Sequence, residues 1–101
     1  MKLVIVTAVE QYEKEVLKLF KSANIENFSS SDIDGYKNRS SLLMASNWFS
    51  TGKEGSESIM FFSFTDDGHI DTLFNLIKEF NENMETNNPL KAIVLPIEKF
   101  I

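Results

Sequence analysis

Two short segments of this sequence are apolar on both faces of a β-strand, and they constrain the fold more than any other feature. Residues 3–8 are β-branched or apolar with little polar interruption. In residues 58–65 the large side chains alternate between the two faces, with Met60, Phe62 and Phe64 on one and Ile59 and Phe61 on the other. Strands of this kind lie in a sheet whose two faces are both covered.

Two other segments have apolar residues at helical spacing. Residues 10–23 carry an apolar stripe made of Tyr12, Val16, Leu19, Phe20 and Ala23. Glutamates precede lysines along this segment, which suits the helix dipole, and Asn24 is a residue type that ends helices. Residues 69–83 carry a second stripe, made of Ile70, Leu73, Ile77, Phe80 and the following Met84. Asp66 and Asp67 precede it and can cap its first turn.

Two weaker strands complete the pattern. Residues 29–33 alternate before Gly35, and residues 90–97 form a last strand that Pro96 ends or confines to a sheet edge. We expect residues 98–101 to form a short tail of one helical turn.

The order strand, helix, strand, strand, helix, strand predicts an α+β fold of the ferredoxin-like type. In this fold a four-stranded antiparallel sheet carries both helices on one face. The length of 101 residues predicts a single domain, residues 1–101. Two helices leave the second face of the sheet bare, and monomers rarely tolerate a large exposed apolar patch. The sequence therefore predicts an oligomer.

Composition narrows the functional classes. The net charge of −5 and a pI near 4.8 argue against nucleic acid as a partner, because phosphate binding needs a basic surface. The absence of cysteine excludes disulfides, thiolate metal sites and cysteine nucleophiles. No apolar run approaches the length of a signal peptide or a membrane span, so we expect a cytoplasmic protein. No nucleophile–base pair, metal-ligand spacing or phosphate-binding glycine motif is present, and we expect a protein that is not an enzyme.

A long polar stretch, residues 36–57, separates the second and third strands. It contains two of the four glycines and the only tryptophan. A loop of this length in a compact domain is usually functional or disordered. Trp48 and Phe49 lie in its middle, and either they fold back onto the domain or they are aromatic anchors for a partner.

The chain resembles the PII signalling proteins. These are trimeric ferredoxin-like regulators, and they have a long T-loop where this chain has residues 36–57. The similarity rests on four segments in the same order: Met1-Lys2-Leu3-Val4, Asp32-Ile33-Asp34-Gly35-Tyr36, Thr65-Asp66-Asp67 and Lys91-Ala92-Ile93-Val94-Leu95-Pro96-Ile97-Glu98. The resemblance implies a homotrimer that binds a small-molecule effector in the cleft between subunits. It also implies docking on a partner, such as a membrane transporter or another regulated protein, through the loop.

The resemblance also assigns residues. Gly35, Tyr36, Lys37, Arg39 and Lys91 would lie at the loop base and bind the effector, and Trp48 and Phe49 would contact the partner. Ordinary surface roles for the lysines and the arginine are the alternative. Where the family has a glycine-rich loop that cradles nucleotide phosphates, this chain has Glu85-Thr86-Asn87-Asn88-Pro89-Leu90, without glycine. We therefore expect no tightly bound cofactor, and only weak or unusual binding of an adenine nucleotide.

A second family offers an alternative. The divalent-cation tolerance proteins share the trimeric ferredoxin-like architecture and handle metals. Only His69, beside Asp66 and Asp67, and Met44 could supply ligands of the kind that this function needs. His69 is otherwise a residue at a solvent-facing helix N-terminus, and we expect no metal site.

Overall fold

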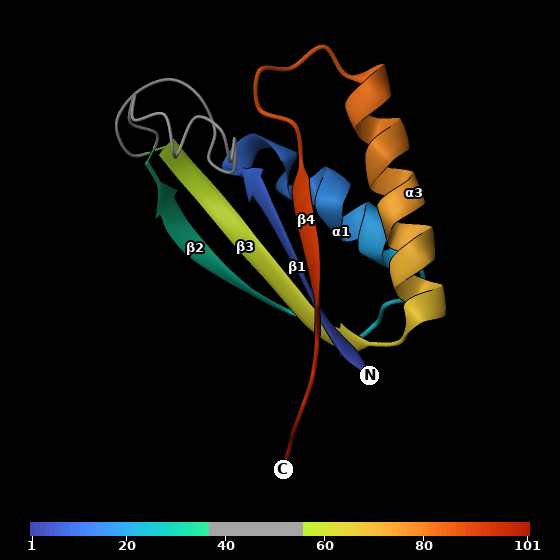
Figure 1. Cartoon of the computed structure of the whole chain (residues 1–101). Helices are drawn as coiled ribbons and strands as arrows, with labels where there is room; N and C mark the ends of the chain where they lie inside the picture. The colour runs from blue at the N-terminus through green and yellow to red at the C-terminus, as the bar shows by residue number, and fades with distance from the viewer. Residues whose placement is uncertain (37–55) are drawn as a thin grey trace, which may run out of the picture.

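The computed structural model describes residues 1–36 and 56–101. The elements follow the expected order: strand β1 (Lys2–Val9), 3-10 turn η1 (Glu10–Tyr12), helix α1 (Glu13–Ser22), strand β2 (Ser29–Gly35), strand β3 (Ser56–Thr65), helix α3 (Asp67–Asn83) and strand β4 (Lys91–Pro96). The sheet order is β2-β3-β1-β4, and every neighbouring pair is antiparallel. Both helices cover the same face of the sheet, as Figure 1 shows. The expected ferredoxin-like arrangement is confirmed.

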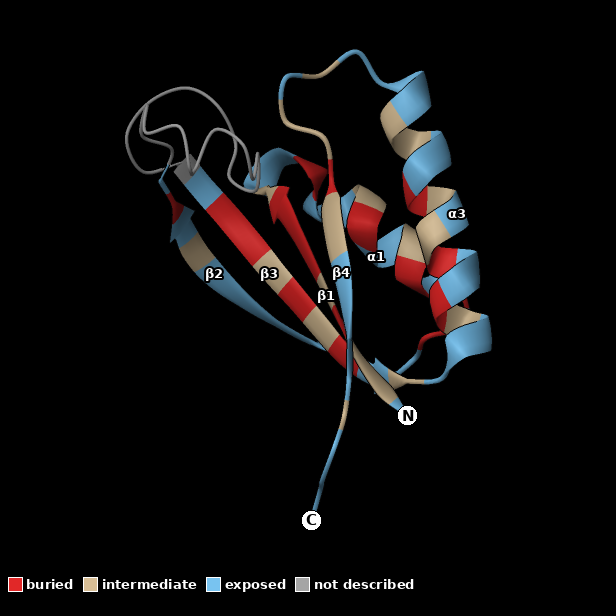
Figure 2. Ribbon diagram, in the orientation of Figure 1, coloured by how far each residue is buried: buried red, intermediate tan, exposed pale blue. Residues whose placement is uncertain are grey.

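The core forms between the sheet and the two helices. On β1 and β3 the apolar side chains that face the helices are buried, while the side chains between them, Thr7 and Ser58 excepted, are only partly buried or exposed, and Figure 2 shows this alternation along β3. Phe20 of α1, Phe61 of β3 and Leu73 of α3 are completely buried. The helices meet where the Tyr12 and Phe80 rings lie edge to face with centroids 5.5 Å apart. The stripes seen in the sequence are therefore the core faces of the helices.

Local signals end both helices where the sequence indicates. Asn24 adopts a left-handed conformation with φ of 59°. The Ile25 N–H donates to the Phe20 carbonyl and the Asn24 N–H donates to the Lys21 carbonyl, each at 3.0 Å, which is the Schellman pattern of helix ends. At the start of α3, an Asp66 carboxylate oxygen accepts the His69 backbone N–H at 3.2 Å.

Two expectations need correction. The first helical segment begins with the 3-10 turn Glu10–Tyr12, directly after β1, and α1 itself starts only at Glu13. Residues 98–101 form no helical turn: they continue beyond β4 as irregular chain that points away from the sheet (Figure 1). A helix of four residues without packing partners is unstable, because forming its first turn costs more free energy than its few hydrogen bonds contribute. Neither described helix is long and apolar enough to cross a membrane.

The face of the sheet opposite the helices is apolar and partly exposed. The β-pairing places large apolar side chains from all four strands on it, namely Leu3, Ile5, Ile33, Met60, Phe62, Phe64, Ile93 and Leu95. We call this set the outer face. Exposure reaches 58% for Phe64 and 45% for Leu95, and no described segment covers this face. The apolar character that the sequence shows on both sides of β1 and β3 is confirmed, and one chain buries only one of the two sides.

Candidate functional site

The described part of the loop base is built by the end of β2. Gly35 is buried and pairs with Ser56 at the start of β3, so the two strands still lie side by side where the loop begins. Tyr36 follows and is 59% exposed. Lys37, Arg39, Trp48 and Phe49 lie outside the described residues, and their predicted roles remain predictions.

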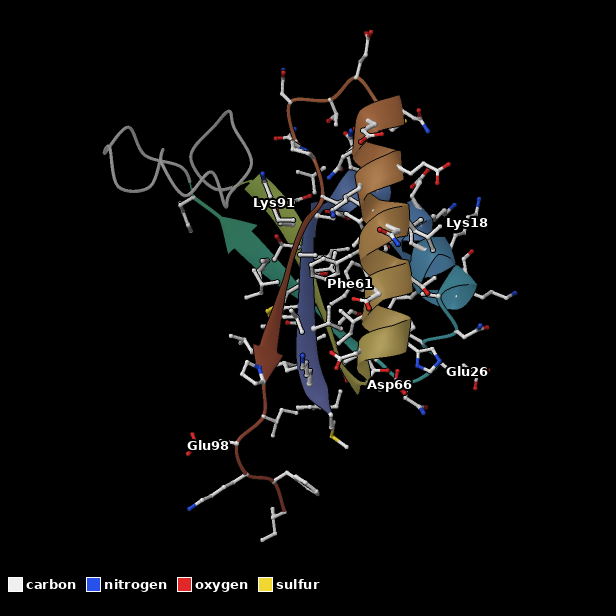
Figure 3. All side chains as sticks on the ribbon, turned by 45° about the vertical axis from the view of Figure 1, so that its right-hand side comes forward. Lys18, Glu26, Phe61, Asp66, Lys91 and Glu98 are labelled. Carbon is white, nitrogen blue, oxygen red and sulfur yellow. The ribbon has the colours of Figure 1, made fainter. Side chains whose placement is uncertain are left out.

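Lys91 is on the opposite edge of the sheet. It opens β4, is half-buried, and pairs with Thr7 of β1 toward the end of the sheet where the loop leaves (Figure 3). Because β3 and β1 lie between β2 and β4, Lys91 is at least three strand spacings, or roughly 14 Å, from Gly35. A single chain therefore does not bring together the described members of the predicted effector site.

The segment before β4 has its backbone donors turned inward. The Asn88 N–H donates to the Thr86 hydroxyl at 3.0 Å. Pro89 has no N–H. The Leu90 N–H donates to the Asn81 side-chain oxygen at 2.8 Å, and the Asn81 amide donates back to the Leu90 carbonyl at 3.0 Å. Residues 88–90 therefore have no backbone N–H left to hold a phosphate in this conformation.

An acidic depression lies beside the loop base. It has a volume of about 660 Å³ and is lined by Val9, Glu10, Gln11, Glu13, Lys14 and Glu57. The pKa of the Glu10 carboxyl is raised above its ordinary value of 4.5, first by a hydrogen bond with Glu57 and then by the Glu57 charge. Burial and the charges of Asp32 and Glu13 act in the same direction. The concentration of carboxylates makes this depression unfavourable for an anionic ligand.

The polar groups at the start of α3 form a helix cap. The Asp66 carboxylate contacts the His69 ring Nδ1 at 2.8 Å in addition to the His69 N–H. Lys2 pairs with Asp67 at 2.8 Å. His69 is thus at a helix N-terminus, as the sequence indicates. Within residues 1–36 and 56–101, no three His, Asp or Glu side chains are grouped so that they could hold a metal ion.

Two features of this region are not visible in the sequence. The Glu10–Glu57 pair joins residues 47 positions apart, and the Asn81–Leu90 clamp joins a helix to the residue that precedes β4. In the sequence Glu10 is only an acidic residue in a first helical turn. Asn81 is only a polar residue beside the apolar stripe, so neither carries a signal for its partner.

Comparison with known proteins identifies the fold. No family model and no curated protein matches the sequence. Among solved structures, the chain is similar to CPII, a nitrogen regulatory PII-like protein from Thiomonas intermedia, bound to ADP, AMP and bicarbonate. The match has a TM-score of 0.62 and 10% sequence identity, and it covers 99% of this chain and 94% of that one. The resemblance to the PII-like proteins is thereby confirmed in the fold: this chain has the ferredoxin-like fold of a PII-like protein over nearly its whole length.

Proposed function

We propose that this protein is a PII-like regulator, and not an enzyme. In this proposal it assembles as a homotrimer, binds a small effector between subunits and docks on a partner protein through residues 36–57. The observation that carries the proposal is the outer face, combined with a fold that in CPII belongs to a nitrogen regulatory PII-like protein. An apolar sheet face with Phe64 58% exposed and Leu95 45% exposed needs a partner surface, and further copies of the chain can supply one.

The oligomeric state is the first test. Closed cyclic symmetry is the usual way to bury a repeated apolar face, and obligate interfaces commonly bury more than about 2,000 Å². Light scattering at micromolar protein concentration should give the mass of three chains of 11.6 kDa each. A monomeric mass under these conditions would overturn the proposal.

The effector site is proposed to lie between neighbouring copies. Lys91 is on one edge of the sheet and Gly35 and Tyr36 are on the other, so a cyclic assembly would bring Lys91 of one copy toward the loop base of the next. Lys37 and Arg39 would add positive charge at the same place. This arrangement suits a small anion, and CPII is described as bound to ADP, AMP and bicarbonate.

Because the backbone N–H groups of residues 88–90 are already engaged, we expect some anions to bind more weakly than others. A triphosphate or diphosphate held by the backbone needs free N–H groups, which this segment does not offer. We expect calorimetry to show ATP binding weaker than micromolar. A micromolar or tighter ATP affinity that Lys91→Ala abolishes would overturn this expectation. Bicarbonate, cyclic AMP, ADP and AMP belong in the same series, with Cu(II) and Zn(II) as tests of the metal-handling alternative.

The partner contact is proposed for Trp48 and Phe49. Because Trp48 is the only tryptophan, its fluorescence reports on this stretch alone. If the ring is kept for a partner, acrylamide should quench it strongly in the free protein. Trp48→Ala should then leave the trimer and the melting temperature nearly unchanged while weakening the partner complex roughly thirtyfold, as for other aromatic hot spots. Weak quenching together with a much lower melting temperature would place both rings in the core instead.

A further inference from the structure

The segment that follows β4 exposes a large aromatic side chain. Residues 97–101, here called the β4 extension, continue away from the sheet as irregular chain (Figure 1). Ile97 is half-buried, but Phe100 is 79% exposed. In this position the Phe100 side chain buries little apolar surface within its own chain. Its ring is therefore available for contact with a second molecule.

A notch near the opposite edge of the sheet combines polar residues with the partly exposed rings of two phenylalanines. Strand β3 pairs with β1 as far as Thr65, but its pairing with β2 stops at Phe62, opposite Ser29. The last three residues of β3 therefore have a strand partner on one side only. A depression of about 320 Å³ lies there, lined by Glu26, Asn27, Phe28, Ser29, Phe62, Ser63 and Phe64, and we call it the β3 notch. Phe62 and Phe64 lie edge to face on its rim, with ring centroids 6.4 Å apart.

The extension and the notch lie at the same end of the sheet. Pro96, the last residue of β4, and Thr65, the last residue of β3, both pair with Lys2 of β1. Strand β2 starts at this end as well, because Ser29 pairs with Phe62. The extension leaves from the β4 edge, whereas the notch lies where β3 continues beyond β2, and β1 lies between β3 and β4.

Cyclic symmetry brings these two features together between copies. In a closed ring built around an axis along the strands, every copy points the same way, so where neighbouring copies meet at their sheet edges, the β4 edge of one faces the β2 edge of the next. The extension of one copy then emerges beside the notch of its neighbour. Five extended residues span roughly 17 Å, which exceeds the spacing of about 5 Å between adjacent strands. Within one chain the extension points away from the sheet (Figure 1).

The geometry points to an exchange of C-terminal segments: the β4 extension of each copy packs Phe100 against Phe62 and Phe64 in the β3 notch of the next copy. The inference rests on the proposed trimer and adds to it a specific contact. Edge-to-face packing of a third ring on this aromatic pair buries surface that each chain alone exposes. Lys99 and Glu26 are both exposed and of opposite charge, so their approach in this arrangement is electrostatically favourable.

Engineered cysteines test the contact directly, because the natural chain has none that could interfere. The double variant Phe64→Cys, Phe100→Cys is oxidised with copper phenanthroline and run on a non-reducing gel. A disulfide requires Cα atoms within about 7 Å, so a ladder of covalent dimers and trimers would place Phe100 at Phe64 of a neighbour. The matched control is Phe64→Cys, Lys18→Cys, because Lys18 lies on the surface of α1 away from the sheet (Figure 3). The control should give no ladder.

The outcomes separate this inference from the proposed function. Loss of both thiols without a ladder would mean that the extension folds onto its own notch, and it would overturn the inference. No disulfide in a protein that scatters as a trimer would also overturn it, while the trimer stands. A monomeric protein would overturn both. As a further measurement, Phe100→Ser should raise the concentration at which the trimer half-dissociates by roughly thirtyfold, as expected for an aromatic anchor. Leu17→Ser, which changes an exposed apolar residue on α1, should leave that concentration unchanged.

Discussion

At the residue scale, Asp66 links the stability of α3 to pH. The His69 backbone N–H is the main cause that lowers the pKa of the Asp66 carboxyl below its ordinary value of 3.8, and the His69 ring and the Gly68 N–H add to this effect. A group whose pKa is lowered by folding stabilises the protein at pH values above its unfolded pKa. That contribution is lost as the pH falls through the lower folded pKa. The cap is thus an acid-labile element of the fold.

Replacing Asp66 by asparagine isolates this charge. Asparagine caps helices about as well as aspartate but does not titrate. We expect Asp66→Asn to have a melting temperature that falls less than that of the natural protein between about pH 5 and pH 2. Circular dichroism melts over this range make the comparison. Parallel curves for the two proteins would show that the Asp66 charge contributes nothing.

Asn81 is the second residue whose side chain has a clear structural task. Its amide makes two hydrogen bonds to Leu90, which is 2% exposed, and so holds the chain entering β4 against α3. Asn81→Ala removes partners from two buried backbone groups, at about 1–3 kcal/mol each, so we expect the free energy of unfolding to drop by about 2–6 kcal/mol. Asn81→Asp keeps the acceptor for the Leu90 N–H but sets a carboxylate oxygen against the Leu90 carbonyl oxygen, which only a protonated carboxyl can serve as a donor. Its stability, measured by urea unfolding, should therefore exceed that of Asn81→Ala at a pH low enough to protonate the carboxyl, and equal stability of the two variants there would contradict this assignment.

At the element scale, the two faces of β3 have different roles: one packs in the core and the other lies on the outer face. The ring of Phe61 is fully buried on the helix side, with centroids 5.8 Å from Phe20 and 6.4 Å from Phe28. Its neighbour Phe62 lies on the outer face. Phe61→Ala should lower the free energy of unfolding by about 3–5 kcal/mol through the cavity that it leaves. Phe62→Ala should act mainly on assembly. Urea unfolding and light scattering on both variants test the division, and equal effects on unfolding and on mass would contradict it.

At the scale of the whole molecule, the outer face makes stability depend on protein concentration. If copies of the chain bury this face, the folded state is favoured by mass action, and the melting temperature rises with concentration. Each chain carries a net charge of −5, so salt should strengthen assembly by screening repulsion between copies. We expect a higher melting temperature at each tenfold increase in protein concentration and at higher salt. A melting temperature that is constant over two orders of magnitude in concentration would indicate a stable monomer.

The candidate site shows where inference from the sequence reaches its limit. Lys91 and Gly35 can be singled out by resemblance, but their positions on opposite edges follow only from the strand order. The missing glycines before β4 are visible in the sequence. That the Asn88 N–H is engaged by Thr86, and the Leu90 N–H by Asn81, nine residues away and on another element, follows only from the tertiary structure. Such contacts do not recur with a regular spacing along the chain, so no local sequence pattern predicts them.

The sequence by itself determined the elements of this fold, because their causes are local. Alternation over residues 58–65, the helical stripes through Phe20 and Leu73, and the signals at Asn24 and Asp66 each act within a few residues. Only the tertiary structure decided which features meet. The Glu10–Glu57 pair and the placement of the β4 extension and the β3 notch at one end of the sheet arise from strand pairing, and the Asn81 clamp arises from the packing of α3 beside the chain that enters β4. Pairing joins residues far apart in the chain, and the free energy that selects it comes from burying the whole core rather than from any one segment.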